Sequence, residues 1–210
     1  LLIAIALVCA PARAWLADAP WRVLTNRFLP PPMKPRRKPD YFPVENLAEG
    51  WAARHLDGHH EFDEYRFVNC DFSDADLSNL RFTDCLFEGC NLSSARLADT
   101  ALQNVAFTEC KLLGLQFTAC RDMLFGVHFD YCQLRYASFA GRKMPGTRFG
   151  RCTLDEVDFA DADLSGAMFQ DCSLAGAVFQ NTRLVGADFT SATGFVIDPE
   201  TNPLLRARFT

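Results

Sequence analysis

From Phe62 onward, a large hydrophobic residue recurs at every fifth position, and polar residues fill most of the positions between. A small residue, usually Ala, Cys, Thr or Val, stands two positions before each large one. The period continues to Phe189 and is broken once, by two extra residues between Phe117 and Leu124. A period of five cannot keep one face of an α-helix apolar at 3.6 residues per turn, so an amphipathic helix is excluded. Such internal repetition indicates a repeat architecture.

A second period of twenty residues is superimposed on the first. Every fourth large residue is Phe, with a spacing of twenty-two only across the insertion: Phe67, Phe87, Phe107, Phe129, Phe149, Phe169, Phe189 and Phe209. Residues of one type at this spacing are expected to stack, so that four pentapeptides make one coil. We therefore predict an all-β, four-sided solenoid of about seven coils, whose large and small repeat residues point inward. Stacking buries a continuous core that one repeat cannot form alone.

The repeat units resemble a known motif. Residues 75–79 (Ala-Asp-Leu-Ser-Asn) and 162–166 (Ala-Asp-Leu-Ser-Gly) are similar to the A(D/N)LXX motif of pentapeptide-repeat proteins, over about 150 of the 210 residues. The resemblance implies a right-handed quadrilateral β-helix. The stretch 193–209 is similar to the ending of bacterial members, which include quinolone-resistance proteins and a microcin immunity protein that act on DNA gyrase. The resemblance thus implies a rigid protein-interaction scaffold with gyrase or another topoisomerase as partner, although fold alone does not assign function.

The chain divides into four segments. Residues 1–32 are interpreted as a signal-like or misannotated extension outside the fold, 33–61 as a basic Pro-rich linker and capping helix, 62–192 as the solenoid and 193–210 as an irregular closing coil. Helical spacing of Val44, Leu47, Trp51 and Leu56 predicts the capping helix over residues 44–57. The helix would cover the open sheet edge of the first coil, which otherwise invites aggregation.

Two interpretations of the N-terminus stay open. Residues 1–10 form an apolar run followed by Ala12-Arg13-Ala14, a pattern typical of a secretory signal and its cleavage site. Alternatively, translation starts at Met33, ahead of a basic segment that ends at Lys38. The first interpretation predicts a periplasmic or secreted protein, and the second predicts a cytoplasmic one.

Two positions depart from the repeat pattern. The insertion at Arg121-Asp122 is expected to form a small bulge or loop at one corner, after which Leu124 resumes an inward column. Arg142 falls in an inward position, where an unpaired charge would be costly. We expect a distorted corner to turn the Arg142 side chain outward.

Eight of the nine Cys follow the repeat. Six form one column of inward small residues, namely Cys70, Cys90, Cys110, Cys132, Cys152 and Cys172, and Cys85 and Cys120 fall in the same slot on other faces. Buried free Cys behaves as a small apolar residue, so we interpret the column as core filler. The sequence has no C-x-x-C, H-E-x-x-H, G-x-S-x-G or Gly-rich phosphate loop. We therefore expect no catalytic site, metal, cofactor or small-molecule substrate.

Charge provides the remaining functional signal. Residues 62–192 contain eighteen Asp and Glu against eleven Lys and Arg, a net charge of −7. The predicted partner-binding surface consists of Asp155, Glu156, Asp158, Asp161, Asp163 and Asp171. A negative rod disfavours direct nucleic-acid binding. The rod has about a third of the net charge density of DNA. It would therefore mimic DNA only weakly when it docks on a basic protein surface.

The alternative function is an exported structural or envelope-associated repeat protein with no topoisomerase role. An exposed last coil would permit an isologous homodimer contact.

Overall fold

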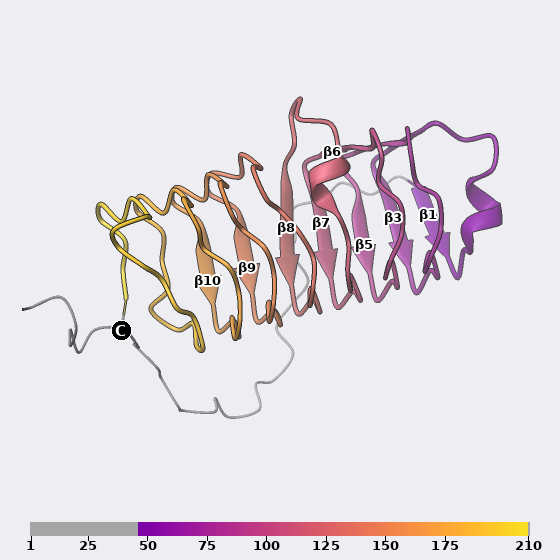
Figure 1. Ribbon diagram of the computed structural model, residues 1–210. Helices are drawn as coiled ribbons and strands as arrows, with labels where there is room; N and C mark the ends of the chain where they lie inside the picture. The colour runs from indigo at the N-terminus through magenta and orange to yellow at the C-terminus, as the bar shows by residue number, and fades with distance from the viewer. Residues whose placement is uncertain (1–45, 210) are drawn as a thin grey trace, which may run out of the picture.

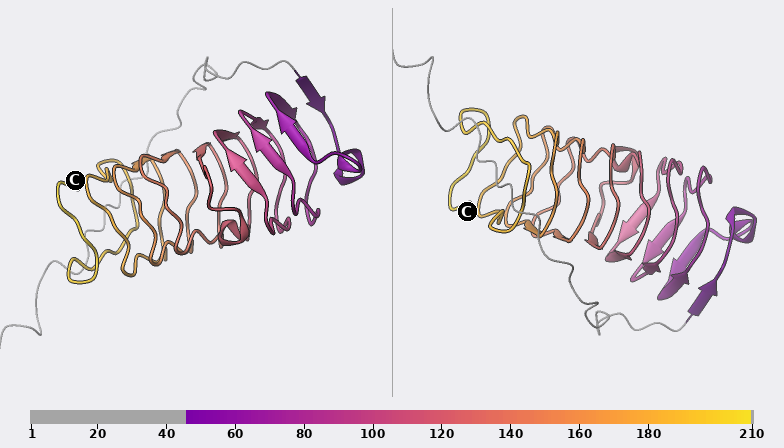
Figure 2. Two further views of the ribbon diagram at one scale, coloured as in Figure 1. Left: turned by 90° about the horizontal axis from the view of Figure 1, so that it is seen from above. Right: turned by 90° about the horizontal axis from the view of Figure 1, so that it is seen from below.

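The computed structural model describes residues 46–209, which form a parallel β-solenoid whose turns stack along one axis (Figure 1). Views from above and below show the same rod, with β1 near one end and the C-terminus at the other (Figure 2). The solenoid predicted from the period of five is therefore confirmed. Among the described residues, no helix has the length and apolar character needed to cross a membrane.

One side of the rod carries a parallel sheet that has seven strands within the described residues. In spatial order they are β1 (Asn46–Glu49), β3 (Tyr65–Val68), β5 (Leu86–Glu88), β7 (Val105–Thr108), β8 (Val127–Asp130), β9 (Arg148–Gly150) and β10 (Met168–Gln170). A second parallel sheet contains β2 (Glu61–Asp63), β4 (Arg81–Thr83) and β6 (Ala101–Gln103). Elsewhere, isolated parallel bridges such as Asp71 to Asn91 join successive coils.

The corners of each coil depend on a left-handed backbone residue. Asn69, Asp74 and Asn79 follow one another at intervals of five, with φ of 52°, 55° and 62°. Asn and Asp tolerate this region better than other non-glycine residues, and Gly adopts it without strain. The polar residue or Gly two positions after each inward large residue is thus explained by the turn that it makes.

The Phe residues spaced by twenty form one stack along the core. Rings of Phe67 and Phe87 lie 4.6 Å apart with planes 12° apart, and those of Phe149 and Phe169 lie 5.1 Å apart with planes 2° apart. From Phe67 to Phe189, every member of the stack is at most 2% exposed. Offset stacking of this kind adds to the free energy gained from burial.

The N-terminal cap contains less helix than the sequence pattern predicts. Asn46–Glu49 form β1, which pairs in parallel with β3, and only Ala53–Leu56 form a 3-10 turn, η1. The open edge of the first coil pairs with this segment, which is therefore a strand with side chains on alternating faces. Accordingly, Leu47 is 62% exposed and Ala48 is buried. Trp51 lies edge-on against Phe67 at 6.2 Å, so the core is still covered. Val44 lies outside the described residues.

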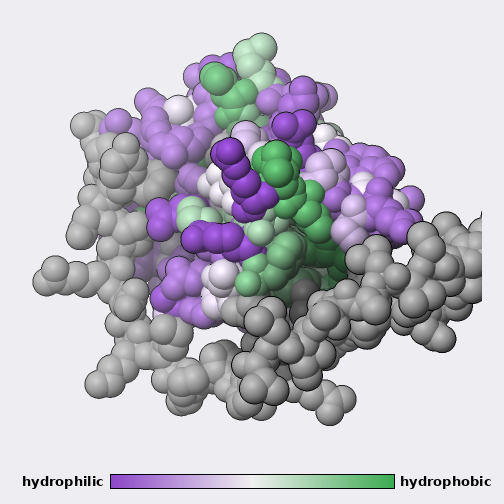
Figure 3. Space-filling model, turned by 90° about the vertical axis from the view of Figure 1, so that its left-hand side faces the viewer, coloured by the Kyte–Doolittle hydropathy of each residue, from purple (hydrophilic) through white to green (hydrophobic). Residues whose placement is uncertain are grey.

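At the other end, residues 198–202 form a compact turn. The Asp198 carboxylate accepts from the backbone N–H of Glu200 at 2.9 Å. The buried Asn202 amide donates to the Phe179 carbonyl at 2.9 Å and accepts from the Thr182 N–H at 2.8 Å. In earlier coils the equivalent N–H donates to the carbonyl three residues before it, as Ala162 does to Phe159, so the Asn202 amide is inserted into this turn of the preceding coil. Figure 3 looks onto this end, where apolar side chains reach the surface; Val196 is 60% and Leu205 is 70% exposed.

Candidate interaction surfaces

The six carboxylates of the predicted partner-binding surface do not share one face. Asp158 lies in the ladder that bridges Ser138 and Val178, whereas Asp163 lies in the ladder that bridges Lys143 and Arg183. These ladders run along different faces of the rod. The chain turns a corner of the solenoid about every five residues. Residues that are close in sequence therefore lie on successive faces around one coil.

Three of the six carboxylates have basic partners within the solenoid. Asp155, whose side chain is 14% exposed, pairs with Arg135 at 3.0 Å and accepts from the Ser173 hydroxyl and the Ala175 N–H. Asp163 lies 4.0 Å from Arg183, and Asp171 lies 4.0 Å from Arg151. These three groups are partly occupied in holding successive coils together.

The other three carboxylates border a single face, which we call the acidic face: Glu156, Asp158 and Asp161. Asp158 lies on the face, and Glu156 and Asp161 occupy the left-handed corners on either side of it, with φ of 59° and 58°. Asp158 accepts from the Ala160 N–H at 2.9 Å, and Asp161 accepts from the Asn181 amide at 3.3 Å. Within residues 46–209, no ion pair involves these three residues.

Charge pairs one coil apart recur elsewhere on the surface. Glu61 pairs with Arg81 at 3.0 Å and Asp76 with Arg96 at 2.8 Å, each at a spacing of twenty residues. An exposed pair contributes about 0–1 kcal/mol to stability. Their larger effect is electrostatic. In each pair the arginine neutralises the neighbouring carboxylate, so paired carboxylates contribute little to the negative potential around the rod.

The insertion forms a loop that projects from one corner, between the 3-10 turn η2 (Phe117–Ala119) and β8 (Figure 1). Met123 is 75% exposed and Leu124 is 71% exposed, with Leu124 in the left-handed region at φ 58°. The prediction that Leu124 resumes an inward column is wrong. Phe125 instead packs against the core, with its ring 6.4 Å from that of Phe117. Because of the two inserted residues the chain turns back toward the core later, so Phe125 rather than Leu124 faces inward.

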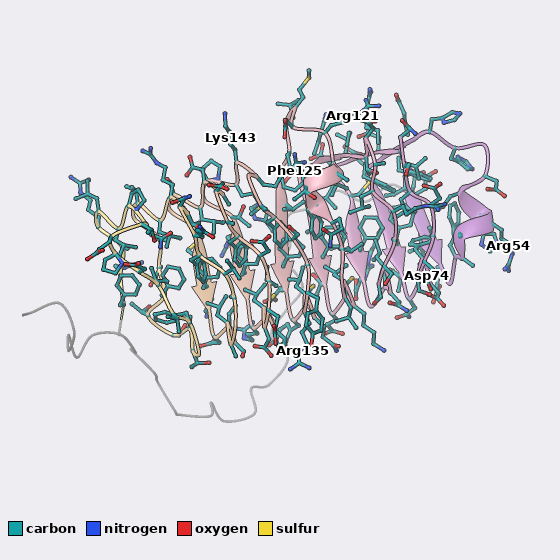
Figure 4. All side chains as sticks on the ribbon, viewed as in Figure 1. Arg54, Asp74, Arg121, Phe125, Arg135 and Lys143 are labelled. Carbon is teal, nitrogen blue, oxygen red and sulfur yellow. The ribbon has the colours of Figure 1, made fainter. Side chains whose placement is uncertain are left out.

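Arg142 anchors this loop from inside the solenoid. Its side chain is 5% exposed, so the expectation that it turns outward is also wrong. The guanidinium donates to the Asp122 carboxylate and to the Arg121 carbonyl, the latter at 3.0 Å. It also lies 4.3 Å above the Phe125 ring, a favourable cation–π arrangement. Figure 4 shows Arg121, Phe125 and Lys143 around this corner.

A physical reason for the buried charge is now evident. Sequence reasoning treated Arg142 as unpaired, but the insertion places a carboxylate, a free carbonyl and an aromatic ring directly beneath it. The signal was available as the spacing of twenty residues between Asp122 and Arg142, which other acid–arginine pairs of this chain share.

A groove crosses the outer surface of β7 to β10, lined by His128, Asp130, Arg148 and Arg151 among others. Burial raises the pKa of Asp130, and burial followed by repulsion from Arg148 lowers the pKa of His128. Arg151 pairs with Asp130 at 3.3 Å and lies 4.8 Å above the Tyr131 ring. Cations and carboxylates alternate here, so the groove favours neither an anionic nor a cationic ligand.

The eight cysteines of the described residues are buried, and none forms a disulfide. Burial raises the pKa of Cys85 and of Cys120 to about 12, so both stay protonated at neutral pH. A protonated thiol is a weak nucleophile. Among residues 46–209, no group of three or more His, Cys, Asp or Glu residues is arranged to hold a metal ion.

Comparisons with known proteins agree on the repeat. A family model described as "Pentapeptide repeat region" matches residues 60–123 and 116–189. No curated protein matches the chain. Among solved structures, full-length QnrB1, a plasmid-mediated fluoroquinolone resistance protein, is 20% identical with a TM-score of 0.44, over 79% of this chain and 92% of that one. HetL of the cyanobacterium Nostoc sp. strain PCC 7120, involved in heterocyst differentiation regulation, is 17% identical with a TM-score of 0.40, over 80% and 87%. Likeness at this level carries no information about activity.

Proposed function

The chain belongs to the pentapeptide-repeat family, and we propose that it acts as a non-enzymatic scaffold that docks on another protein through its outer surface. The observation that carries this proposal is that different positions of each repeat form the core and the surface. The large and small inward residues fill the core, and the remaining residues, mostly polar, form the surface of a rigid rod. Binding by a pre-ordered surface loses little conformational entropy.

The partner that we propose is DNA gyrase or another topoisomerase, which the rod would contact in place of DNA. Support comes from the C-terminal stretch similar to that of gyrase-directed family members and from the net charge of −7 over residues 62–192. Glu156, Asp158 and Asp161 are the carboxylates of the predicted surface that no ion pair within residues 46–209 engages. A basic DNA-binding surface is complementary to such a face, and complementarity of this kind mainly sets specificity and association rate.

A supercoiling assay with purified gyrase tests this proposal. We expect the protein to inhibit supercoiling, or to reduce the DNA cleavage that a fluoroquinolone stabilises. Glu156→Lys, Asp158→Lys and Asp161→Lys combined should abolish either effect. A matched control reverses three exposed charges away from the acidic face, Glu49, Asp57 and Glu109, and should retain the effect. The absence of any effect of the wild-type protein on gyrase or topoisomerase IV would reject this partner.

An exported structural or envelope-associated protein is the second candidate, and the apolar run with Ala12-Arg13-Ala14 favours it. Mass spectrometry of the mature N-terminus in fractionated cells separates the two. A chain that begins at Trp15 outside the cytosol supports export and removes gyrase from reach. A chain that begins at Met33 or Lys34 in the cytosol supports the topoisomerase proposal.

A further inference from the structure

Six cysteine side chains form a continuous column inside the solenoid. Every member is at most 2% exposed, and each comes from a successive coil: Cys70, Cys90, Cys110, Cys132, Cys152 and Cys172. The environment repeats from coil to coil. The thiol of Cys110 donates to the Phe87 carbonyl at 3.4 Å, and that of Cys132 donates to the Phe107 carbonyl at 3.3 Å. The six sulfur atoms therefore occupy equivalent positions along one axis.

Neighbouring thiols of the column lie one coil apart and bond to adjacent coils. The backbone N–H of Cys70 donates to the sulfur of Cys90 at 3.3 Å, and the Cys90 thiol donates to the Phe67 carbonyl of the preceding coil at 3.3 Å. Coils in a parallel sheet lie ~4.8 Å apart. A zinc–thiolate bond is ~2.3 Å long, so twice such a bond nearly equals the spacing between coils. A metal ion midway between two neighbouring sulfur atoms could thus reach both of them.

We propose that the cysteine column binds soft two-coordinate d¹⁰ cations such as Hg(II), each between two sulfur atoms of adjacent coils. Soft thiolates select soft ions over the hard cations that oxygen ligands prefer. A linear site needs only two ligands, and both sulfur atoms of a pair stand on the same side of the core. The inference does not depend on the proposed docking function.

The binding step balances in atoms and charge. One Hg(II) displaces the S–H protons of two thiols, forms two Hg–S bonds and releases two protons to solvent. The product is neutral, which matters because an uncompensated charge in an apolar core is strongly disfavoured. Because binding releases protons, uptake should strengthen as the pH rises.

The chain contains its own control thiols. Cys85 has Tyr65 and Val105 as its neighbours one coil away, and Cys120 has Thr100 below it and Arg142 above it. Both are buried like the members of the column, although Cys120 is slightly more exposed, at 6% against 0% for Cys85. They differ from the column in having no adjacent thiol, so a comparison isolates adjacency from burial.

Two triple variants of the full chain test the proposal with equal numbers of thiols. The column variant carries Cys90→Ala, Cys132→Ala and Cys172→Ala, which leaves no two column thiols adjacent. The control variant carries Cys9→Ala, Cys85→Ala and Cys120→Ala, which leaves the column intact. Ala192 continues the same column in the native chain, so Ala fits the slot. Each reduced protein is equilibrated with HgCl₂ and excess glutathione, and retained mercury is counted by native mass spectrometry.

We expect the wild-type protein and the control variant to retain up to three Hg(II) per chain, one for each pair of the six thiols. The column variant should retain none, and X-ray absorption of the loaded control should show two sulfur ligands around each mercury ion. Equal retention by both variants, or none by the wild type, would overturn the proposal. Should the column variant fail to fold, Cys152→Ala alone isolates Cys172 and must reduce retention from three to two.

Discussion

The Arg142 guanidinium donates to the Asp122 carboxylate from a side chain that is 5% exposed, whereas the Asp122 side chain is 96% exposed. The pair joins the insertion loop to the coil above it, with one charge inside the solenoid and the other in water. Because the carboxylate keeps most of its hydration, the desolvation cost falls on the guanidinium. The Phe125 ring and the Arg121 carbonyl offset part of that cost.

The first prediction is that Arg142→Ala loosens the loop and destabilises the fold by about 1–3 kcal/mol. Ala162 fills the equivalent slot one coil later, so the substituted residue fits, but the loop loses two hydrogen bonds and the stacking on Phe125. Urea unfolding measures the loss, and hydrogen exchange should accelerate over residues 121–126 alone.

Arg142→Met provides the control, since it keeps much of the packing without the charge. Faster exchange spread along the whole solenoid, or unchanged exchange in the loop, would contradict the anchoring role of Arg142.

The second prediction concerns the Phe stack. Phe149 lies between Phe129 at 5.3 Å and Phe169 at 5.1 Å, so Phe149→Ala removes two stacking contacts and opens a cavity. We expect a loss of about 3–5 kcal/mol. Phe209 contacts Phe189 at 5.5 Å from the last coil and is only partly buried, so Phe209→Ala should cost clearly less. Equal losses in urea unfolding would argue against a ladder stabilised by its neighbours on both sides.

These inward columns could be predicted from sequence because a period fixes them without any knowledge of partners. The orientations of Arg142 and Leu124 could not be predicted in this way, because they depend on the path that the chain takes through the two inserted residues. The segment 46–49 has helical spacing, yet it becomes a strand because an open sheet edge lies beside it. The acidic residues 155–171 look like one cluster in sequence, but the corners distribute them around the rod.

The third prediction concerns acid stability. The Ser73 hydroxyl donates to Asp71 at 2.7 Å, and this bond, together with the Ser73 N–H, lowers the pKa of Asp71. A lowered folded-state pKa contributes stability above the unfolded pKa of about 3.9, and that contribution is lost as the pH falls through the folded value. Removing the Asp71 carboxylate should therefore make the free energy of unfolding fall less steeply with decreasing pH.

Asp71→Asn is a conservative test, because Asn91 makes the same contacts with Ser93 one coil later, at 2.8 and 3.1 Å. We expect stability at pH 7 to stay nearly unchanged and the decline below pH 5 to become shallower, as thermal unfolding across pH measures. A steeper decline than in the wild type would show that the sign of this linkage is wrong.

The fourth prediction separates carboxylates that hold coils together from those that we propose for partner binding. Asp155 accepts hydrogen bonds from Ser173 and Ala175 and pairs with Arg135, so Asp155→Ala should reduce stability by about 1–3 kcal/mol. Asp158 accepts from the Ala160 N–H alone among the described contacts, so Asp158→Ala should cost less stability. If the proposed docking is right, Asp158→Ala should nevertheless weaken the effect on gyrase more than Asp155→Ala does. Unfolding and supercoiling measured on the same preparations decide the matter, because a general electrostatic effect would weaken both variants equally.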